Sequence, residues 1–471
     1  MESQSRHGRL LWMLLLGVAM ALLAPVGAGA ATLHPTLLAK AAYGAVSPGF
    51  ARTADGTLHV AFETNTSTGW GDSANGVAAL SISPSGHVGP QVQALNWNNA
   101  GGSPNGIPGL AVMPSGALEA TFGGSPSGDD GPWGISSSDG GSSWSAPADI
   151  GSGSMEFGDS NVRVQVSNGA PVLTAGCCGA VVIQQGFGPG SNTYQVTNNT
   201  DGAAGNVDST VDAATGAVVD SWGSNDGTGG LWIQQVAPSQ GTAVKAPIPS
   251  QYGTGVALIV AGRDSGPGVF AAYPANYATT THMRLLRYGG GSVGVGSANG
   301  LHAASWGVAT GPAGRIWVIW SGLVNGKGIT AITRSNKGVT KFEPIQTYGF
   351  TWANLFTNSG DGRRGPLDLL LGGTPASPPS AAYGIYYARL LPELSAHVSS
   401  KSLGGGKFKL TVKVNDAGDA VSGAKASAKG KHGTTNSSGV AKFTVSGSVG
   451  KHVTVTISAP SYATLKEKVK L

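Results

Sequence analysis

The residues best suited to ligand chemistry are aromatic side chains, carboxylates and two adjacent cysteines in Gly-rich connections between apolar segments. An aromatic ring beside carboxylate and amide groups suits a sugar, which has an apolar face and hydroxyl edges. These types do not single out a catalytic residue. The sequence therefore predicts a ligand face whose candidate residues are Trp70, Asp72, Asp130, Asp159, Arg163, Cys177, Cys178, Trp222, Asp226, Tyr277 and Trp352.

Cys177 and Cys178 are the only cysteines of the chain. The Cα atoms of trans neighbours lie about 3.8 Å apart, below the roughly 4.4–6.8 Å of ordinary disulfides. A vicinal disulfide would therefore be a strained ring, and it would close almost no loop. Three interpretations remain open: a stiff apolar platform in a ligand site, two small buried thiols, or an incidental pair.

Metal and cofactor motifs are absent from the sequence. The nine histidines show no spacing typical of a metal site. The glycine runs at 289–291 and 404–406 lack the strand-then-helix context of a phosphate-binding loop. The sequence therefore predicts no metal and no cofactor.

A unit of two apolar strands around a Gly turn, a variable loop and a third strand recurs seven times. The Gly turns, 47 to 60 residues apart, lie at 56, 116, 169, 216, 266, 314 and 365. The third strands are predicted at 76–82, 131–137, 180–185, 230–235, 282–287, 328–334 and 383–389. A period near fifty with short strands is typical of β-propeller blades. The predicted fold is all-β, a propeller of seven blades with six as the runner-up, and the 11% of charged residues argue against helical bundles.

One turn carries a recognisable motif. Ser137, Asp139, Gly141 and Trp144 fit the Asp-box pattern S-x-D-x-G-x-T-W, with Ser143 in place of Thr, and residues 335–342 hold a degenerate copy. With this motif the chain resembles the sialidase-like, Asp-box (BNR-repeat) β-propellers over about residues 45–391. The resemblance implies that the Asp-box residues are structural and lie opposite the active site.

Sialidase activity would require, by the same resemblance, an Arg triad, an Asp acid/base and a Tyr–Glu pair. The first Arg belongs before an Ile-Pro pair, and Gly106 stands there, before Ile107 and Pro108. The preferred function is therefore binding of an extracellular ligand, most plausibly a glycan. One alternative is a glycoside hydrolase, exo-sialidase-like, or a polysaccharide lyase using two of Asp72, Asp129, Asp130, Glu156, Asp159 and Asp226. A second alternative is a structural adhesion protein.

Residues 1–30 are typical of a secretory signal peptide. Arg6 and Arg9 precede an apolar run at 10–23, and 28–30 is an A-x-A-like cleavage site. The run is shorter than the ~20 residues of a membrane span. We expect a secreted, extracellular protein without a membrane span.

The remaining chain divides by charge into two predicted domains. Residues 31–395, the propeller, hold 15 basic and 20 acidic residues. Residues 396–471, a small β-sandwich that resembles Ig-like or prealbumin-like bacterial modules, hold 12 Lys and three acids. This lysine excess suits an acidic cell-wall polymer or a solubilising surface, and nucleic acid is not expected because no aromatic side chains interleave with the lysines.

Overall fold

A computed structural model of the protein describes residues 31–32, 35–40, 48–64, 76–96, 103–125, 131–152, 161–177, 180–196, 203–224, 230–247, 260–275, 281–298, 300–325, 327–349, 352–375 and 384–471. The predicted signal peptide lies outside these residues. Within them the chain is all-β apart from one short 3-10 turn, η1 (Pro312–Gly314). None of the described residues forms a helix long and apolar enough to cross a membrane.

The first strands form antiparallel sheets in which chain order runs from the inner strand outward. One sheet contains β3 (Gly49–Arg52), β4 (Leu58–Thr64), β5 (Gly76–Ile82) and β6 (Val92–Asn96). An eight-stranded sheet joins β7 (Ser103–Val112), β8 (Leu118–Ser125), β9 (Gly131–Ser137) and β10 (Ala148–Asp149) to β11 (Asn161–Ser167), β12 (Ala170–Cys177), β13 (Ala180–Gln185) and β14 (Asn192–Gln195). Its two halves meet at the parallel pair β7–β11.

Further sheets follow in the same order. They contain β15 (Ala203–Val211), β16 (Val218–Ser224), β17 (Gly230–Ala237) and β18 (Val244–Lys245), then β19 (Val260–Gly262), β20 (Val269–Pro274), β21 (His282–Arg287) and β22 (Ser292–Ser297). The next contains β23 (His302–Thr310), β24 (Ile316–Val324), β25 (Lys327–Arg334) and β26 (Gln346–Gly349), with β1 (Ala31–Thr32) at its edge. The last contains β27 (Trp352–Asp361), β28 (Leu367–Pro375) and β29 (Gly384–Leu390), with β2 (Thr36–Lys40) outermost.

The predicted third strands are confirmed, because β5, β9, β13, β17, β21, β25 and β29 lie within two residues of their predicted positions. The predicted turn glycines all adopt a positive φ, from 72° to 107°. Side chains with a Cβ rarely adopt this conformation. At Gly216 an added Cβ would also approach Asn168 Oδ1 to 2.7 Å.

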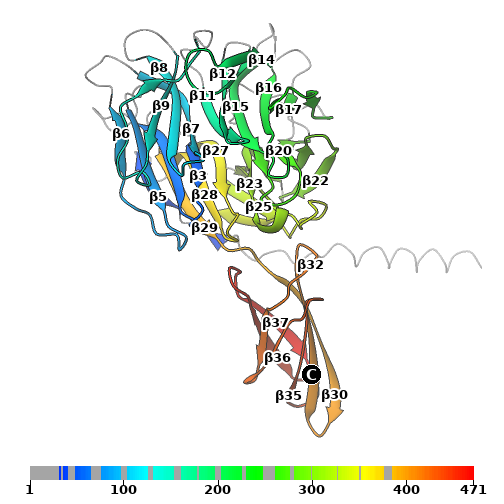
Figure 1. The fold of residues 1–471 in the computed structure, drawn as a ribbon. Coiled ribbons are helices and arrows are strands. Elements are labelled where there is room, and N and C mark those ends of the chain that lie inside the picture. The colour runs from blue at the N-terminus through cyan, green and yellow to red at the C-terminus, as the bar shows by residue number, and fades with distance from the viewer. Residues whose placement is uncertain are drawn as a thin grey trace, which may run out of the picture.

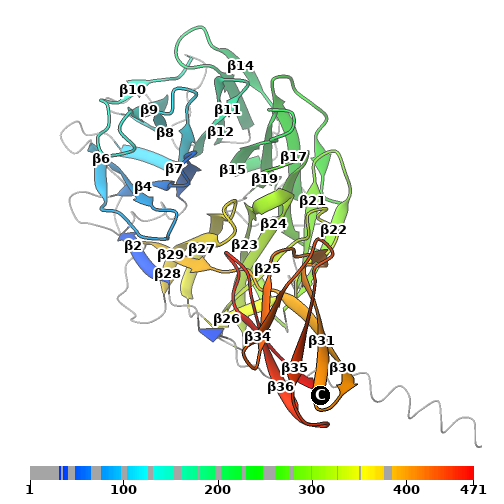
Figure 2. The ribbon, with the colours of Figure 1, turned by 60° about the horizontal axis from the view of Figure 1, so that its bottom comes forward.

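Apolar clusters fill the interfaces between neighbouring sheets and continue from each sheet to the next. Leu58, Val60 and Phe62 of β4 pack with Leu370 and Ile385, which joins the first of these sheets to the last. The sheets therefore form a closed ring around a central axis, as Figure 2 shows from blue to yellow.

Two further contacts close this ring between segments more than 300 residues apart. The first is strand β2, which pairs antiparallel with β29 as the outer strand of the last sheet. The second is Arg52 of β3, which donates to Asp361 Oδ1 (2.9 Å) and Asp368 Oδ2 (2.8 Å) of the last sheet. Both groups are almost fully buried, so closure combines a strand with a buried ion pair.

The turn of residues 137–144 is held by the Asp139 carboxylate. Its Oδ1 accepts hydrogen bonds from Ser137 Oγ (2.8 Å) and from the amides of Ser142 (3.0 Å) and Ser143 (2.9 Å). Trp144 packs against the adjacent apolar cluster. These bonds stabilise the ionised carboxylate, and the Ser143 hydroxyl contributes most to lowering the pKa of Asp139 to about 2.

The C-terminal residues form two further sheets below the ring (Figure 1). One contains β30 (Ser395–Gly404), β31 (Lys407–Asp416), β32 (Asp419–Ala420) and β35 (Val440–Ser446), and the other β33 (Lys425–Ala428), β34 (Lys431–Thr434), β36 (His452–Ser458) and β37 (Leu465–Lys470). The predicted alternation in β31 is confirmed, with Phe408 and Leu410 buried and Lys407 and Lys409 exposed. The buried residues of both sheets share one apolar cluster.

This C-terminal part, residues 395–471, docks on the ring through Arg334 of β25. The Arg334 guanidinium lies 5.0 Å from the ring centre of Trp317 and 5.5 Å from that of Tyr462. It pairs with Asp416 at 2.8 Å and with Glu343 at 3.3 Å. All of these groups except Tyr462 are buried, so the junction is an ionic cluster enclosed by aromatic rings.

The charges at this junction balance. Arg315 pairs with Asp416 (3.1 Å) and Asp419 (2.8 Å). Burial raises the pKa of Glu343 to about 8, so this carboxyl is largely neutral at pH 7. Burial alone would raise the pKa of Asp416, but Arg334, Arg315 and the hydrogen bonds of Glu343 and Tyr462 together outweigh it and lower the pKa. Two arginines therefore face two aspartates beside Glu343, whose pKa is raised.

We expect Arg334→Met to cost about 3–5 kcal/mol, the range for removing one partner of a buried ion pair. Asp416 would lose its closest cation, and the aromatic rings would lose the guanidinium between them. Urea denaturation followed by Trp fluorescence should show the loss. Arg363→Met is the control, because the Arg363 side chain is 45% exposed where it pairs with Asp361, and we expect it to cost about 1 kcal/mol or less. Equal losses in the two variants would contradict the prediction.

The turn at Asp139 generates a pH-dependent prediction. Because the folded pKa is lowered to about 2, the carboxylate stabilises the fold above its unfolded pKa of about 3.9 and loses this effect as the pH falls toward 2. Asp139→Asn should therefore lower the melting temperature at pH 7, with the difference shrinking steadily below pH 4. Thermal scans from pH 7 to pH 2.5 would measure this. Glu393→Gln, at an exposed position, is the control, and a pH-independent difference would refute the role given to Asp139.

Candidate functional site

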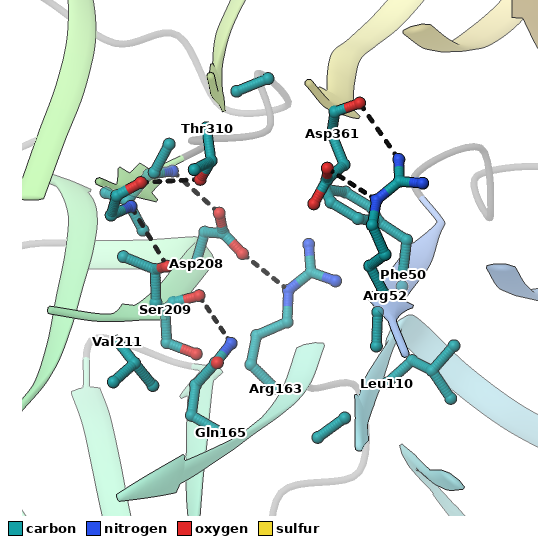
Figure 3. Close-up of a pocket in the computed structure, with 18 of the residues that line it drawn as sticks. Phe50, Arg52, Leu110, Arg163, Gln165, Asp208, Ser209, Val211, Thr310 and Asp361 are labelled. Carbon is teal, nitrogen blue, oxygen red and sulfur yellow. Dashed lines mark hydrogen bonds and ion pairs between the residues drawn. The ribbon is translucent and has the colours of Figure 1, made fainter. Parts of the chain in front are cut away.

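A cavity of about 380 Å³ lies on the axis of the ring. Its walls are the inner strands β3, β7, β11, β15, β19, β23 and β27, together with the turns that follow several of them. Figure 3 shows Arg52, Asp361, Arg163 and Asp208 pointing into this space from different strands. The cavity is therefore polar and charged although it lies inside the ring.

Arg52 and Asp361 form one side of the cavity. Asp361 also accepts from Arg363 Nε (2.7 Å), and Asp368 accepts from the Tyr387 hydroxyl (2.7 Å). Burial alone would lower the pKa of Arg52, but the carboxylates of Asp361 and Asp368 outweigh it and raise the pKa. Arg52 is thus held as a cation whose donors already bind carboxylates.

Arg163, a predicted ligand residue, lies on the opposite side of the cavity. Its Nε is 3.2 Å from Asp208 Oδ1, and its Nη1 donates to the Pro108 carbonyl at 2.9 Å. Asp208 Oδ2 in turn accepts from the Val260 amide at 2.9 Å. Burial lowers the pKa of Arg163 and raises that of Asp208. The pair links β11 to β15, so its position is explained by packing as well as by access to the cavity.

A third arginine of the cavity binds only carbonyl groups. Arg263 donates to the carbonyl oxygens of Gly314 (2.9 Å), Pro267 (3.1 Å) and Lys337 (2.6 Å). Arg315, an arginine that the sequence also places beside an inner strand, lies at the junction with Asp416 instead. Among the described residues lining the cavity, each arginine is bound to a carboxylate or a carbonyl group. These residues therefore do not form the three-arginine carboxylate clamp that the sialidase resemblance implies.

Trp222, another predicted ligand residue, is a core residue of its sheet. It is 3% exposed and stacks on Trp232 with ring centres 6.4 Å apart and planes inclined by 5°. Lys245 lies over the Trp232 ring at 5.4 Å. The Trp222 ring therefore packs inside the blade instead of facing a ligand, because cross-strand neighbours bury it.

The other predicted residues lie outside what the structure describes. Trp70, Asp72, Asp130, Asp159, Cys178, Asp226 and Tyr277 fall outside the described residues, as do Asp129 and Glu156. Cys177 ends β12 and Trp352 begins β27, but their side chains are likewise outside the description. The bridging and redox state of the cysteine pair therefore stays a prediction.

The strands nevertheless assign these positions to one face. Neighbouring strands of each sheet run in opposite directions. The second strand of a sheet therefore ends at the same end of the ring at which the inner strand of the next sheet begins. The connections that hold the predicted residues leave from that end, which we call the ligand face. The turns at Gly314 and Gly365, and the turn held by Asp139, leave from the opposite end, which we call the hairpin face.

Glu63 is a buried carboxyl that the sequence did not single out. It lies near the end of β4 at the ligand face, is 2% exposed, and its Oε1 has no hydrogen-bond partner. Burial raises its pKa well above the ordinary value. Glu63 lies two residues after Ala61 on β4, so the two side chains are on the same face of the strand. Ala61 packs against the next sheet. Asp220 of β16 is similar, since burial raises its pKa and Thr174 donates to it at 3.3 Å.

A carboxyl inside an apolar strand could have been noticed in the segment Leu-His-Val-Ala-Phe-Glu-Thr, residues 58–64. The strand is buried on both faces, so any side chain at this position loses water. No group of three or more potential metal ligands occurs among the described residues. The structure therefore adds buried carboxyls with raised pKa values, but no metal cluster, to the described part of the chain.

No protein-family model matches the chain, and no curated protein matches it in sequence. Among solved structures it is similar to polysaccharide lyase Uly1, at 8% identity and a TM-score of 0.45, over 80% of this chain and 95% of that one. It is also similar to the BP39L lectin from Burkholderia pseudomallei, at 11% identity and a TM-score of 0.46, over 89% of this chain and 98% of that one. A third similar structure is an alpha-L-arabinanase from Penicillium chrysogenum, at 14% identity and a TM-score of 0.36, over 60% of this chain and 92% of that one. These values are too low for the neighbours to indicate what this chain binds.

Glu63 leads to a stability prediction with a defined sign. Its raised folded pKa means that the unfolded chain releases a proton above about pH 4.5 while the folded chain keeps it. The contribution of Glu63 to the free energy of unfolding is therefore fully present below that pH, and it falls as the pH rises above it. Gln cannot ionise, so Glu63→Gln should be more stable than the parent at pH 8, by about 1–3 kcal/mol, and close to it at pH 4.

Urea unfolding at pH 4 and pH 8 would measure this difference. Glu393→Gln, at an exposed position, should show no comparable gain. A Glu63→Gln variant that is destabilised more at pH 8 than at pH 4 would contradict the prediction, because it would mean that the folded protein uses the ionised carboxylate.

Proposed function

We propose that the protein is a secreted, sialidase-like (Asp-box) propeller of seven blades that binds an extracellular glycan on its ligand face. In this proposal residues 1–30 are a cleaved signal peptide, residues 31–395 the propeller, and residues 396–471 an Ig-like β-sandwich module. The module would contact an acidic cell-wall polymer through its lysines. The turn of Ser137, Asp139, Gly141 and Trp144 would be an Asp box.

The blade count follows from treating the two halves of the eight-stranded sheet as separate blades. They are joined at one parallel residue pair, Val162 with Pro108, whereas strands inside each half pair over several residues. Each half also repeats the order of the other sheets, with the inner strand first. Seven inner strands line the cavity, which supports seven blades over six.

The position of the module is the observation that carries the functional proposal. Its contacts with the ring lie at the hairpin face: Arg315 follows the η1 turn, Lys337 donates its amide to Asp419, and Gly365 is close to Ser461. An Asp box on that face is expected to be structural. The opposite face, where the predicted aromatic and carboxylate residues leave the sheets, stays clear of the module. A single open face with these side chain types suits a glycan.

The paired arginines of the cavity favour binding over sialidase chemistry. A substrate carboxylate needs guanidinium donors that are free to form bidentate bonds. Arg52 and Arg163 instead hold Asp361 and Asp208. We therefore place the ligand at the loops of the ligand face and not inside the channel.

Glu63 favours one second candidate, a glycoside hydrolase or lyase. A carboxyl kept protonated by burial can act as a general acid when it lies beside an ionised carboxylate. Glu63 ends β4 directly before the segment that contains Asp72. In this alternative Glu63 would donate the proton and one ligand-face carboxylate would act as base or nucleophile.

A glycan array with the full-length protein tests the proposal. We expect binding to a limited set of glycans, and Trp70→Ala together with Asp72→Asn should weaken it at least about tenfold, as loss of a stacking platform does. Trp144→Ala is the matched control from the hairpin face: it should lower the melting temperature and leave glycan affinity unchanged.

Three outcomes would change the assignment. An array without hits would refute glycan binding. Equal loss of affinity in Trp70→Ala and Trp144→Ala would move the site away from the ligand face. Turnover of a bound glycan that disappears in Glu63→Gln, while binding persists, would replace the binding proposal by the hydrolase or lyase.

A further inference from the structure

We propose that the outer face of the sheet β34–β33–β36–β37 is a binding surface for a linear acidic polysaccharide. The inference rests on the proposed contact between the module and an acidic polymer, and it assigns that contact to one sheet. This surface, the basic face, lies on the opposite side of the molecule from the ligand face. Strands β34 and β36 are labelled on the module in Figure 2.

Strand register places the lysines of β37 together on the basic face. Lys466, Lys468 and Lys470 alternate with inward positions and are exposed. Neighbouring outward residues of a strand are about 7 Å apart, so these ammonium groups form a regular row. Glu467 lies between them in sequence, but it pairs with the buried Val455 and belongs to the inner side.

Hydroxyl groups flank this row on the next strands. Thr454 lies opposite Lys468, and Thr456 lies opposite Lys466. Thr456 also pairs with Ser427 of β33. Ammonium groups attract the charges of a polymer, and the hydroxyl groups beside them can donate to or accept from sugar hydroxyls. The face therefore matches a charged sugar chain better than a bare anion.

A groove runs across the same sheet. It is lined only by residues of the basic face and its hairpin, including Lys425, Ser427, Lys431, His432 and Thr454. The groove has a volume of about 370 Å³ and lies between β33, β34 and β36. A linear chain that follows it would pass from the Lys425 end toward the row on β37.

The junction with the ring increases the charge asymmetry of the module. Asp416 and Asp419 are bound to Arg315 and Arg334 of the ring. Of the three acidic side chains in residues 396–471, only Glu467 is left away from that junction. Docking therefore removes the carboxylates that would otherwise compete for the lysines.

Two other anionic partners fit the basic face less well. Single-stranded nucleic acid is bound by aromatic platforms, and the outward positions of these four strands are Lys, His, Ser and Thr. A membrane surface requires a broad apolar face. Of the exposed apolar residues of the module, Leu403 lies near the end of β30 and Val449 in the turn between β35 and β36, so neither is on this sheet.

The other sheet also exposes lysines, including Lys401, Lys407 and Lys409. It serves as the comparison because it carries the same charge, while the groove described above is lined by residues of the basic face and its hairpin. A polymer attracted by net charge alone would use either sheet. A polymer seated in the groove would use the basic face.

The test measures binding of the full-length protein to alginate, with dextran as the neutral control. We expect alginate binding that weakens with added salt and no dextran binding. The triple change Lys466→Gln, Lys468→Gln and Lys470→Gln should raise the dissociation constant at least about tenfold. The matched triple Lys401→Gln, Lys407→Gln and Lys409→Gln should change it by less than about twofold, and circular dichroism should show both variants folded.

Other results would overturn the inference. These are equal losses in both triples, no binding of alginate, or tighter binding of single-stranded oligothymidylate. Binding to phosphatidylserine vesicles that depends on Leu403 and Val449 would assign the module to a membrane. Alginate binding lost in Trp70→Ala but kept in the Lys466 triple would move the polymer to the ligand face, which would support the proposed function while refuting this surface. A glycan array without hits, together with the expected loss of alginate binding in the Lys466 triple, would refute the proposed glycan site and support the basic face.

Discussion

A ring of sheets must close between the two ends of its own sequence, and the rest of this structure depends on that closure. Most sheet-to-sheet interfaces of the ring join neighbours along the chain, whereas the first and last sheets are joined through β2, Leu58 and its apolar partners, and Arg52. Contacts at such separation cost more chain entropy than local ones. The β2–β29 strand pair combined with a buried ion pair offsets this cost, which explains why Arg52 serves closure instead of a ligand.

The same reasoning accounts for the other interior charges. A guanidinium buried without a partner would be strongly unfavourable, so Arg163 and Arg334 are each placed against a carboxylate of another sheet. Each pair therefore ties two separate parts of the chain together. The arginines on the axis of the ring are therefore held by structural ion pairs, which is why the proposed ligand site is placed at the loops of the ligand face.

Much of the fold could be predicted from the sequence because it depends on local periodicity. The turn glycines mark each repeat, a third strand follows each of them after a variable loop, and alternation in β31 separates Phe408 from Lys409. The partners of Arg52 and Arg334 could not be predicted, since they lie on strands far away in the chain. Trp222 was misplaced for a related reason: a Trp before a loop can face either a ligand or the neighbouring Trp232, and sequence does not distinguish them.

The buried Arg334 cluster also gives the two proposed surfaces a fixed relation. If the module were connected by a flexible linker, the orientation of the ligand face to the polymer would vary. The cation enclosed between Trp317, Tyr462 and Asp416 instead holds the module against the hairpin face. A polymer bound along the basic face would then leave the ligand face directed away from it. The proposed division of tasks would account for the charge division between an acidic ring and a basic module, because only a surface that meets an acidic polymer needs the lysines.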